Sequence, residues 1–496
     1  MKKNYILPLV TALTISFTLT LHTYTATAWG NDVEVSSSAP QGATSIVAKS
    51  DGSLYASVPE TSLNPTHAMS IYKSIDNGAT WTQLNVGGGS PGQTVVKSKM
   101  IVSSIDSILC IYQVTDSIYT LDVSTGVVYP FSTIDAEDFD VATSSTSNSL
   151  FLFVDEPMAN SIRRYTSNDG GMTWGGTTAQ VTGNGAQPRV YMTGTRLFLA
   201  YFGTIQPDVS LSKIVTTYYD ENVPGTLTSI LASFQDIVTN TTVPKHQYQS
   251  VSVNGSVWFF WTEGMSPSAL KCRFSSDGGL NYGTEFIVAG TATLSIERFD
   301  SKHYSNLVTS GVHLVYYADS LQAGAADQFT ESMLYRSAQF LSPQVFSTPE
   351  RLNDFTVDGS APGFNPTLAS YLYNFTEVVG VLWVQNNGTS PALYFDASSW
   401  TVSIDNVDAL NNIDLNIYPN PSSGRVTIYL DVLQSADFKL SLIDVNARES
   451  CVKSVGFLST GQHEIALEFP ELSSGIYFLK MQSDAVSLYR RIIIAK

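Results

Sequence analysis

The chain is 496 residues long, only 14% of its residues are charged, and its formal net charge is −17. This length exceeds one ordinary domain, so we expect two or three domains. Aromatic and β-branched residues are abundant and no stretch keeps an apolar pattern of helical period, which favours β-structure, while the acidic excess of residues 29–414 excludes nucleic acid and anionic membrane surfaces as partners.

The first 28 residues have the layout of a removable signal peptide. Lys2 and Lys3 supply a positive start, Ile6 to Leu21 is apolar, and Ala26-Thr27-Ala28 places small residues where a signal peptidase needs them. We therefore expect the mature chain to begin at Trp29. A membrane anchor is the alternative, but the apolar segment is short and rich in threonine. No later segment is long and apolar enough to predict a transmembrane span in the mature chain.

Residues 40–405 contain a repeat in which an apolar strand pair is followed by a second hairpin, seven times in all. Four short antiparallel strands at a period of roughly 45 to 60 residues are typical of a β-propeller blade. The expected fold is all-β, with a propeller of seven blades in residues 29–404 and six or eight blades as alternatives. Val33 to Ser37 can add a strand to the last blade and close the ring. The strand pairs begin near Thr44, Ser98, Phe139, Arg189, Gln249, Ser305 and Tyr371.

Three of the second hairpins share a tighter pattern, which resembles the Asp-box or BNR repeat, S-x-D-x-G-x-T-W, of sialidases and other propeller families. The Asp can accept backbone N–H bonds within the turn, the Gly can take a positive φ, and the aromatic residue can pack between sheets. A turn between third and fourth strands lies opposite the usual ligand-binding mouth, so we expect a structural role. The pattern comprises Ser74, Asp76, Gly78 and Trp81; Ser167, Asp169, Gly171 and Trp174; and Ser275, Asp277, Gly279 and Tyr282.

The sialidase-like resemblance implies three arginines that hold the substrate carboxylate, the first of them ahead of the first Asp-box. It also implies a Tyr nucleophile with a Glu partner, and an Asp acid/base. Here the first arginine of the chain is Arg163, well after the first Asp-box. The arginine triad is therefore absent, which argues against a true sialidase.

Loops before the first strand of each blade and after its second strand share one face, the mouth, where a ligand would bind. Acidic groups with nearby aromatics suit a sugar-binding cleft. For each of these residues taken singly, a structural role is commoner than a ligand-binding role. Loop carboxylates are usually solvated, and tryptophans usually pack between blades. The first loops contribute Asp138, Asp140, Arg189, Lys245, His246, Glu297, Arg298 and His303; the second contribute Asp155, Glu156, Tyr201, Glu263 and Asp319, with Trp258 and Trp261 on the strand before Glu263.

No catalytic set is recognisable, and Glu263, Arg298, Asp155 and Asp319 are the candidates for one. No Cys or His cluster has zinc-ligand spacing, so neither a metal nor another cofactor is expected. Ca²⁺ at Asp135-Ala-Glu137-Asp138-Phe-Asp140 is an alternative to an ordinary polar loop. Cys110 and Cys272 can form a bridge or remain buried free thiols.

After a polar linker at residues 405–414, the character of the sequence changes, and alternating apolar positions predict a small β-sandwich over residues 415–496. Its motif residues are Tyr418, Pro419, Asn420, Pro421, Gly424, Gly475, Tyr477 and Lys480. With these residues the segment resembles the type A C-terminal sorting domain of the type IX secretion system of Bacteroidota. That resemblance implies an Ig-like fold, recognition by the secretion machinery at the outer membrane, and removal of the module as the cargo is released or joined to the cell surface.

Two functions remain open for the propeller. The first is a non-catalytic module, secreted or on the cell surface, that binds a glycan or a surface protein. The alternative is a glycoside hydrolase or lyase of an Asp-box propeller family, which would use carboxylates of the mouth.

Overall fold

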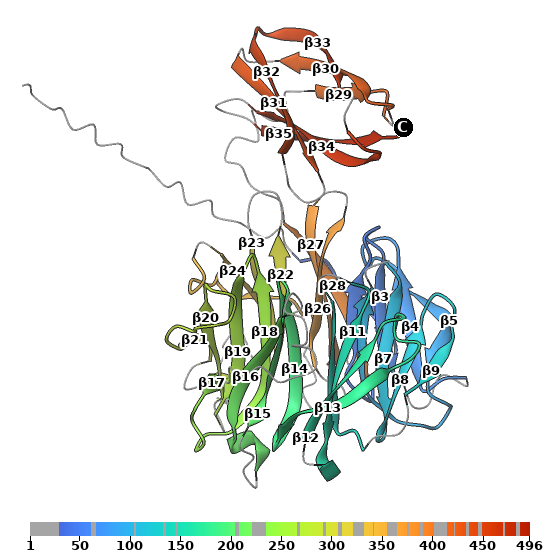
Figure 1. The fold of residues 1–496 in the computed structure, drawn as a ribbon, viewed down its shortest axis with the longest axis vertical. Helices are drawn as coiled ribbons and strands as arrows, with labels where there is room; N and C mark the ends of the chain where they lie inside the picture. The colour runs from blue at the N-terminus through green and yellow to red at the C-terminus, as the bar shows by residue number, and fades with distance from the viewer. Residues whose placement is uncertain are drawn as a thin grey trace, which may run out of the picture. The chain divides into compact units, whose positions relative to one another are not determined.

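The described residues of the computed structural model (Figure 1) fall into two compact units, one within residues 29–400 and one within residues 414–496. The expected signal peptide and residues 401–413, which include most of the expected linker, lie outside the described residues. The structure describes residues 29–60, 66–103, 106–131, 135–144, 147–159, 161–203, 208–220, 235–264, 268–290, 294–305, 310–320, 332–340, 342–354, 365–373, 376–386, 390–400, 414–420, 422–432, 436–444, 449–469, 472–482 and 487–496.

The first unit consists of seven four-stranded antiparallel sheets, which we number as blades 1 to 7. Blades 1 to 3 contain β2 (Ser45–Ala48), β3 (Leu54–Pro59), β4 (Met69–Ser74) and β5 (Thr82–Gly88); β6 (Val95–Val102), β7 (Ile108–Val114), β8 (Ser117–Asp122) and β9 (Val128–Pro130); and β10 (Asp138–Thr143), β11 (Leu150–Glu156), β12 (Ser161–Ser167) and β13 (Gly175–Gly183). The short 3-10 helices η1 (Pro157–Ala159) and η2 (Val209–Leu211) lie in loops of blades 3 and 4.

Blades 4 to 7 follow the same order, except that the last blade takes its outer strand from the N-terminus. They contain β14 (Gly185–Thr193), β15 (Arg196–Gly203), β16 (Lys213–Asp220) and β17 (Gln235–Val238); β18 (Lys245–Val253), β19 (Ser256–Glu263), β20 (Ala269–Ser275) and β21 (Phe286–Ala289); β22 (Leu294–Ser305), β23 (Ser310–Ser320), β24 (Ser332–Gln339) and β25 (Glu350–Arg351); and β26 (Thr367–Tyr373), β27 (Thr376–Asn386), β28 (Pro391–Trp400) and β1 (Val33–Ser36).

The seven sheets form a closed ring. Each first strand contacts the first strand of the next blade, from β2 through β6, β10, β14, β18 and β22 to β26, and β26 contacts β2. β1 pairs antiparallel with β28, with Val33 opposite Phe395, so the N-terminus completes blade 7. The all-β propeller prediction is confirmed, and the described residues form seven such sheets, a number compatible with the repeat.

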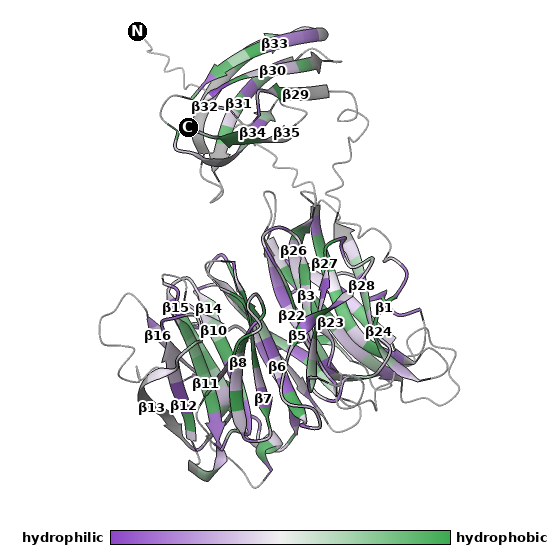
Figure 2. Cartoon of the chain, turned by 90° about the vertical axis from the view of Figure 1, so that its right-hand side faces the viewer, coloured by the Kyte–Doolittle hydropathy of each residue, from purple (hydrophilic) through white to green (hydrophobic). Residues whose placement is uncertain are grey.

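The second strand of each blade explains the strongest sequence signal. It lies in the middle of a sheet that is itself packed between two neighbouring blades, so both of its faces are covered. Every residue of β7 and of β19 is buried accordingly. Figure 2 shows hydrophobic residues concentrated along the strands of the blades. A near-continuous apolar run is what burial on both faces requires.

One predicted boundary is wrong. The first strand of blade 6 was expected to begin near Ser305, but β22 ends there and begins at Leu294. Its register shifts between Ile296 and Phe299, and charged residues occupy much of the strand. A bulge and charges break the alternation of apolar residues, so the strand resembles a loop in the sequence.

Cys110 and Cys272 are both buried free cysteines. They belong to different hydrophobic clusters, Cys110 with blades 1 and 2 and Cys272 with blades 5 and 6. The bridge considered from the sequence does not form. Burial raises the pKa of Cys110 to about 12, so this thiol is inert in the folded ring.

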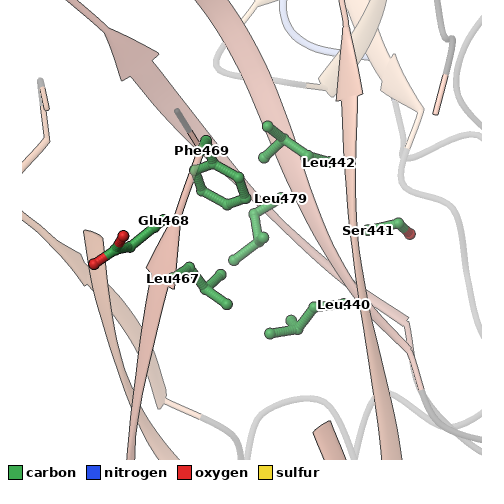
Figure 3. A pocket seen from close by; sticks show the side chains of 7 residues that line it. All are labelled: Leu440, Ser441, Leu442, Leu467, Glu468, Phe469 and Leu479. Carbon is green, nitrogen blue, oxygen red and sulfur yellow. The ribbon is translucent and has the colours of Figure 1, made fainter. Parts of the chain in front are cut away.

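The second unit is a sandwich of a three-stranded and a four-stranded sheet, with one hydrophobic core between them. A cavity of about 50 Å³ in that core is lined by Leu440, Ser441, Leu442, Leu467, Glu468, Phe469 and Leu479, several of which converge on it in Figure 3. It is far smaller than a ligand site. The strands are β29 (Asp414–Tyr418), β30 (Arg425–Val432) and β33 (Gly461–Glu468), and β32 (Glu449–Leu458), β31 (Ala436–Asp444), β34 (Gly475–Gln482) and β35 (Ser487–Ile494).

Candidate functional site

The three Ser-x-Asp turns, residues 74–81, 167–174 and 275–282, join the third and fourth strands of blades 1, 3 and 5. In the first turn, Ser74 Oγ donates to Asp76 Oδ1 at 2.8 Å and accepts Gly78 N at 2.8 Å. Asp76 also accepts the Thr80 N–H at 2.9 Å. The other two turns repeat these bonds at their own Ser and Asp, and the glycine φ is 86° in all three.

Each Ser-x-Asp turn packs its aromatic residue onto the preceding blade. The Trp81 ring lies 5.2 Å from that of Phe395 in blade 7. Trp174 Nε1 donates to Thr120 Oγ1 of blade 2 at 3.1 Å, and the hydroxyl groups of Tyr282 and Tyr191, in blade 4, are 2.9 Å apart. These turns therefore join neighbouring blades, and the first joins blade 1 to blade 7 across the ring closure.

Glu263 ends the second strand of blade 5 at the mouth, where it was expected, but its carboxylate is engaged within the blade. Oε2 accepts Trp261 Nε1 at 2.8 Å and pairs with Lys271 Nζ at 3.2 Å. Oε1 accepts Asn240 Nδ2 at 2.9 Å, and the residue is only 6% exposed. A carboxylate held by three donors supports the blade and is poorly placed to transfer protons.

A buried glutamate bonded by side chains of its own blade also occurs in blades 1 and 3. Glu60 accepts Ser70 Oγ at 2.8 Å, and Glu156 accepts the Tyr165 hydroxyl at 2.5 Å and pairs with Arg163 at 3.0 Å. All three glutamates follow or end a second strand in a blade that carries a Ser-x-Asp turn, 11 to 14 residues before the turn's serine. Glu60 was not predicted from the sequence, and this recurring spacing is the signal that could have identified it.

The mouth residues of blades 2 to 4 form a chain of ion pairs between first strands. Lys97 Nζ lies 2.6 Å from Asp138 Oδ1, and Arg189 Nη1 lies 2.6 Å from Asp138 Oδ2. Burial opposes the charge of Asp138, yet Arg189 and Lys97 lower its pKa to about 2. Lys99 pairs with Asp140 in the same way. Asp138 and Asp140 therefore face lysine and arginine side chains of the neighbouring first strands.

Blades 5 to 7 use side-chain bonds to the neighbouring backbone instead. Gln247 donates to the Phe299 carbonyl at 2.7 Å and accepts its N–H at 3.0 Å. Asp300 accepts the Leu368 N–H at 2.9 Å, as Asp140 accepts the Val190 N–H at 2.7 Å. These contacts satisfy the inner edges of first strands, whose backbone groups have a sheet partner on one side only.

Asp155 is the next-to-last residue of the second strand of blade 3 and lies directly opposite Asp138 in the register of β10 and β11. Its Oδ2 accepts Gln187 N at 2.8 Å, and the residue is 3% exposed. Burial raises the pKa of Asp155 to about 7, a shift that the Gln187 bond opposes and the charges of Glu137 and Asp138 increase. The facing carboxyl groups of Asp138 and Asp155 thus have pKa values below and above the ordinary aspartate pKa, respectively.

We expect Asp155→Asn to stabilise the protein at pH 8 by about 1 kcal/mol and to leave its stability at pH 4 nearly unchanged. Because the folded pKa is raised to about 7, the stability that Asp155 provides at low pH is lost as the pH rises from about 4 through 7. Urea unfolding across this range measures the change. Asp138→Asn is the control, and its stability should depend on pH in the opposite direction because the pKa of Asp138 is lowered. If the stability of both variants depended on pH in the same way, the raised pKa of Asp155 would be contradicted.

Most other predicted mouth residues lie on the mouth, and one does not. Arg298 is exposed in the bulge of β22, and His246 is exposed in the bulge of β18. Asp319 is half-buried near the end of β23, opposite Ser295. His303 pairs with Val312 near the far end of β22, so its placement on the mouth is wrong because that strand begins eleven residues earlier than expected.

The remaining predicted residues are packed between strands or blades. Trp258 and Trp261 are fully buried, which agrees with the expectation that they pack between blades. Tyr201 and Lys245 are buried as well. The side chain of Glu297 lies outside the described residues. Among the described residues, no group of three or more His, Cys, Asp or Glu side chains is arranged to hold a metal ion.

In the second unit, two motif residues connect the start of the sandwich to later parts of the chain, Asn420 to β35 and Gly424 to the end of β33. Asn420 Oδ1 accepts Ile493 N at 2.8 Å, and the Gly424 carbonyl accepts Phe469 N at 2.7 Å. Tyr418 is 72% exposed. Gly475 begins β34, which also contains Tyr477 and Lys480, and Pro421 lies outside the described residues.

Residues 416–495 match the family model of the secretion system C-terminal sorting domain. The prediction of a type IX sorting domain is confirmed, and the protein is secreted or attached to the cell surface, with the type IX machinery as the partner that this domain implies. No helix among the described residues is long and apolar enough to cross a membrane. No curated protein matches the chain.

Several solved structures resemble the chain remotely. A protein of unknown function from Dyadobacter fermentans has 13% identity and a TM-score of 0.42, and the match covers 76% of this chain and 99% of that one. PorZ of Porphyromonas gingivalis, a surface component of the type IX system, has 14% identity over 92% of this chain and 60% of that one, with a TM-score of 0.41. An ulvan lyase has 9% identity over 74% and 95%, with a TM-score of 0.48. These similarities are too remote to transfer a function.

Proposed function

We propose that this protein is a non-catalytic binding module, exported by the type IX system, whose propeller presents its mouth to a glycan or a surface protein. The observation that carries the proposal is the engagement of the acidic groups at the mouth. Glu60, Glu156 and Glu263 accept bonds inside their blades, and Asp138 and Asp140 pair with neighbouring first strands. These groups hold the ring together.

The exposed groups of the mouth suit contact with a ligand. Arg298 is exposed, and Lys97, Lys99 and Arg189 keep 22 to 30% of their side chains accessible although each is paired. Guanidinium and ammonium groups on a rigid ring can donate hydrogen bonds to sugar hydroxyl groups, carboxylates or a protein surface. Because the strands that carry them are fixed by their neighbours, binding would require little ordering.

The test combines binding and turnover on the mature chain. We expect retention of a ligand on a glycan array or in a surface-protein capture assay, no product in a panel of glycoside hydrolase and lyase substrates, and weaker binding by Arg298→Ala. Glu263→Gln should lower the free energy of unfolding by about 1–3 kcal/mol without changing binding. Glu156→Gln is its matched control in blade 3. The proposal would be refuted if the mature chain turned over a substrate of the panel, and if Glu263→Gln abolished that turnover while Glu156→Gln preserved it.

A glycoside hydrolase or lyase is the second candidate, and one observation favours it. Asp138 and Asp155 face each other across β10 and β11, and their pKa values are shifted to about 2 and about 7. Paired carboxyl groups with separated pKa values are the arrangement that glycosidases use for a base and an acid. If this candidate were correct, Asp155→Asn would abolish turnover of the substrate while ligand binding remained.

A further inference from the structure

The segment Trp29–Asp32, which precedes β1, bridges blades 6 and 7. The Trp29 ring lies 5.2 Å from that of Tyr335, and Trp29 Nε1 donates to Glu350 Oε2 at 3.2 Å, both in blade 6. The next residue turns to blade 7, where Gly30 N donates to Asp396 Oδ1 at 3.1 Å. The chain therefore enters the ring by contacting both blades that flank the position of β1.

This segment is surrounded by carboxylates whose bonding is incomplete. Asp396 is 3% exposed; its Oδ1 accepts Gly30 and Ala397 N–H groups, while its Oδ2 is buried and has no partner among the described residues. Asp32 Oδ2 accepts the Asp354 N–H and Gln385 Nε2, at 2.8 and 2.7 Å, but its Oδ1 is likewise buried without a partner in the part of the chain that is described.

The charges around this cluster are almost all negative. Burial raises the pKa of Asp396 to about 7, and the charges of Asp32 and Asp354 add to the shift. Burial also raises the pKa of Asp32 to about 6, a shift that the charge of Arg351 opposes. Glu350, with its pKa raised by burial, completes the acidic surroundings. A buried carboxylate with an unpaired oxygen calls for a cation or a hydrogen-bond donor.

We propose that Asp396 receives the α-ammonium group of Trp29 that removal of the signal peptide creates, and that this ion pair locks the entering segment between blades 6 and 7. The inference relies on the expected cleavage after Ala28. Hydrolysis of the Ala28–Trp29 peptide bond adds hydroxide to the Ala28 carbonyl carbon and a proton to the Trp29 nitrogen, which takes a second proton from water at neutral pH. The new charge lies one residue from Gly30, whose N–H already reaches Asp396.

This arrangement makes closure of the ring depend on processing. In the precursor the nitrogen of Trp29 is a neutral amide, so the cluster of Asp32, Asp354 and Asp396 has no neighbouring ammonium. After cleavage, one positive charge meets a buried carboxylate in surroundings of low dielectric, where pairing is strong. β1 is the last strand of blade 7, so fixing the residues before it stabilises the seam between the first and last segments of the propeller.

The experiment compares the mature chain beginning at Trp29 with the same chain carrying a Gly-Ser extension, each with and without Asp396→Asn. We expect the mature chain to have the higher urea midpoint, and Asp396→Asn to remove that difference. Asp300→Asn is the matched control, because Asp300 also accepts the N–H of its own next residue and one distant N–H. It should lower both midpoints equally. A difference that persists in Asp396→Asn, or equal midpoints in the unsubstituted pair, would overturn the proposal.

Reactivity of the terminal amine gives a second readout that needs no variant. The mature chain is treated with an acylating reagent across a pH series, and the N-terminal peptide is quantified by mass spectrometry. We expect the amine to titrate above the ordinary range of about 7.7–8.0, so that acylation at pH 7 is slowed about tenfold for a shift of one unit. Titration within or below the ordinary range would overturn the proposal, even if Asp396→Asn failed to fold.

Discussion

Replacing Gly78 by alanine should lower the free energy of unfolding by about 3 kcal/mol, the largest loss that we expect from a single methyl group in this ring. Gly78 has a φ of +86°, and a Cβ placed on it would lie 1.8 Å from the Phe395 ring. Both the backbone conformation and the space therefore oppose a side chain. Urea unfolding of the mature chain measures the loss.

The expected size of this effect follows from where Phe395 lies. It belongs to β28 of blade 7, and its ring also packs against Trp81 of the first Ser-x-Asp turn. A side chain at Gly78 would push blade 1 away from blade 7, at the closure of the ring, and would expose apolar surface on both. We expect the variant to be cleaved faster by protease in the loops of these two blades than elsewhere in the propeller.

Gly170→Ala is the matched control, since Gly170 also has a positive φ, +74°, but its Cβ would meet nothing within 4 Å. This variant keeps the backbone strain and removes the steric clash, so a loss of only about 1 kcal/mol is expected. Equal losses in the two variants would show that strain alone accounts for the effect and that Gly78 has no special part in closing the ring.

The strand pattern and the turns could be predicted from the sequence because both depend on local physics. β7 and β19 are buried on both faces, so they appear as continuous apolar runs. The Ser-x-Asp turns bond within eight residues, so spacing alone identifies them. Even closure by the N-terminus was visible, because the alternating residues near Val33 have no partner within the first blade.

The roles of charged residues could not be predicted in the same way, because they depend on side-chain partners from other strands or from other blades. Asp138 appears in the sequence as a loop carboxylate, yet Lys97 and Arg189, about 40 and 50 residues away, enclose it. Glu263 is a candidate in the sequence as an acidic group near aromatic residues, yet one of these, Trp261, donates to its carboxylate. Side-chain pairing between neighbouring blades leaves no periodic signal in the sequence.

The β22 error has a related cause. Its bulge at Ile296–Phe299 carries Arg298 to the surface, and this irregularity made the strand look like a loop. Bulges at strand ends redirect side chains and are frequent beside functional sites. Strand irregularities of this kind are hard to place from the sequence, and at Arg298 one of them exposes a charged group at the mouth. For this reason the candidate site was predicted less well than the blades.

Removing residues 415–496 should abolish release or surface display of the protein, with at least a tenfold fall in the exported fraction, while the propeller still folds and accumulates in the periplasm. The physical reason is that the two units have separate cores: the sandwich core is built entirely from residues after 415. Cell fractionation and immunoblotting measure the location, and protease resistance of the retained propeller measures its folding.

Leu440→Asp distinguishes recognition of the folded sandwich from recognition of a linear tail. Leu440 is 2% exposed in the core between the two sheets, so burying a carboxylate there should unfold the sandwich and leave the propeller intact. If the secretion machinery recognises the folded domain, this variant should be retained in the periplasm like the deletion. Normal export of the deletion variant would refute the role of the domain in export. If the deletion variant is retained but Leu440→Asp is exported, the secretion machinery recognises the motif strands as a flexible segment, without the folded sandwich. The separate cores make these outcomes distinguishable, because Leu440 lies in the hydrophobic core of the sandwich.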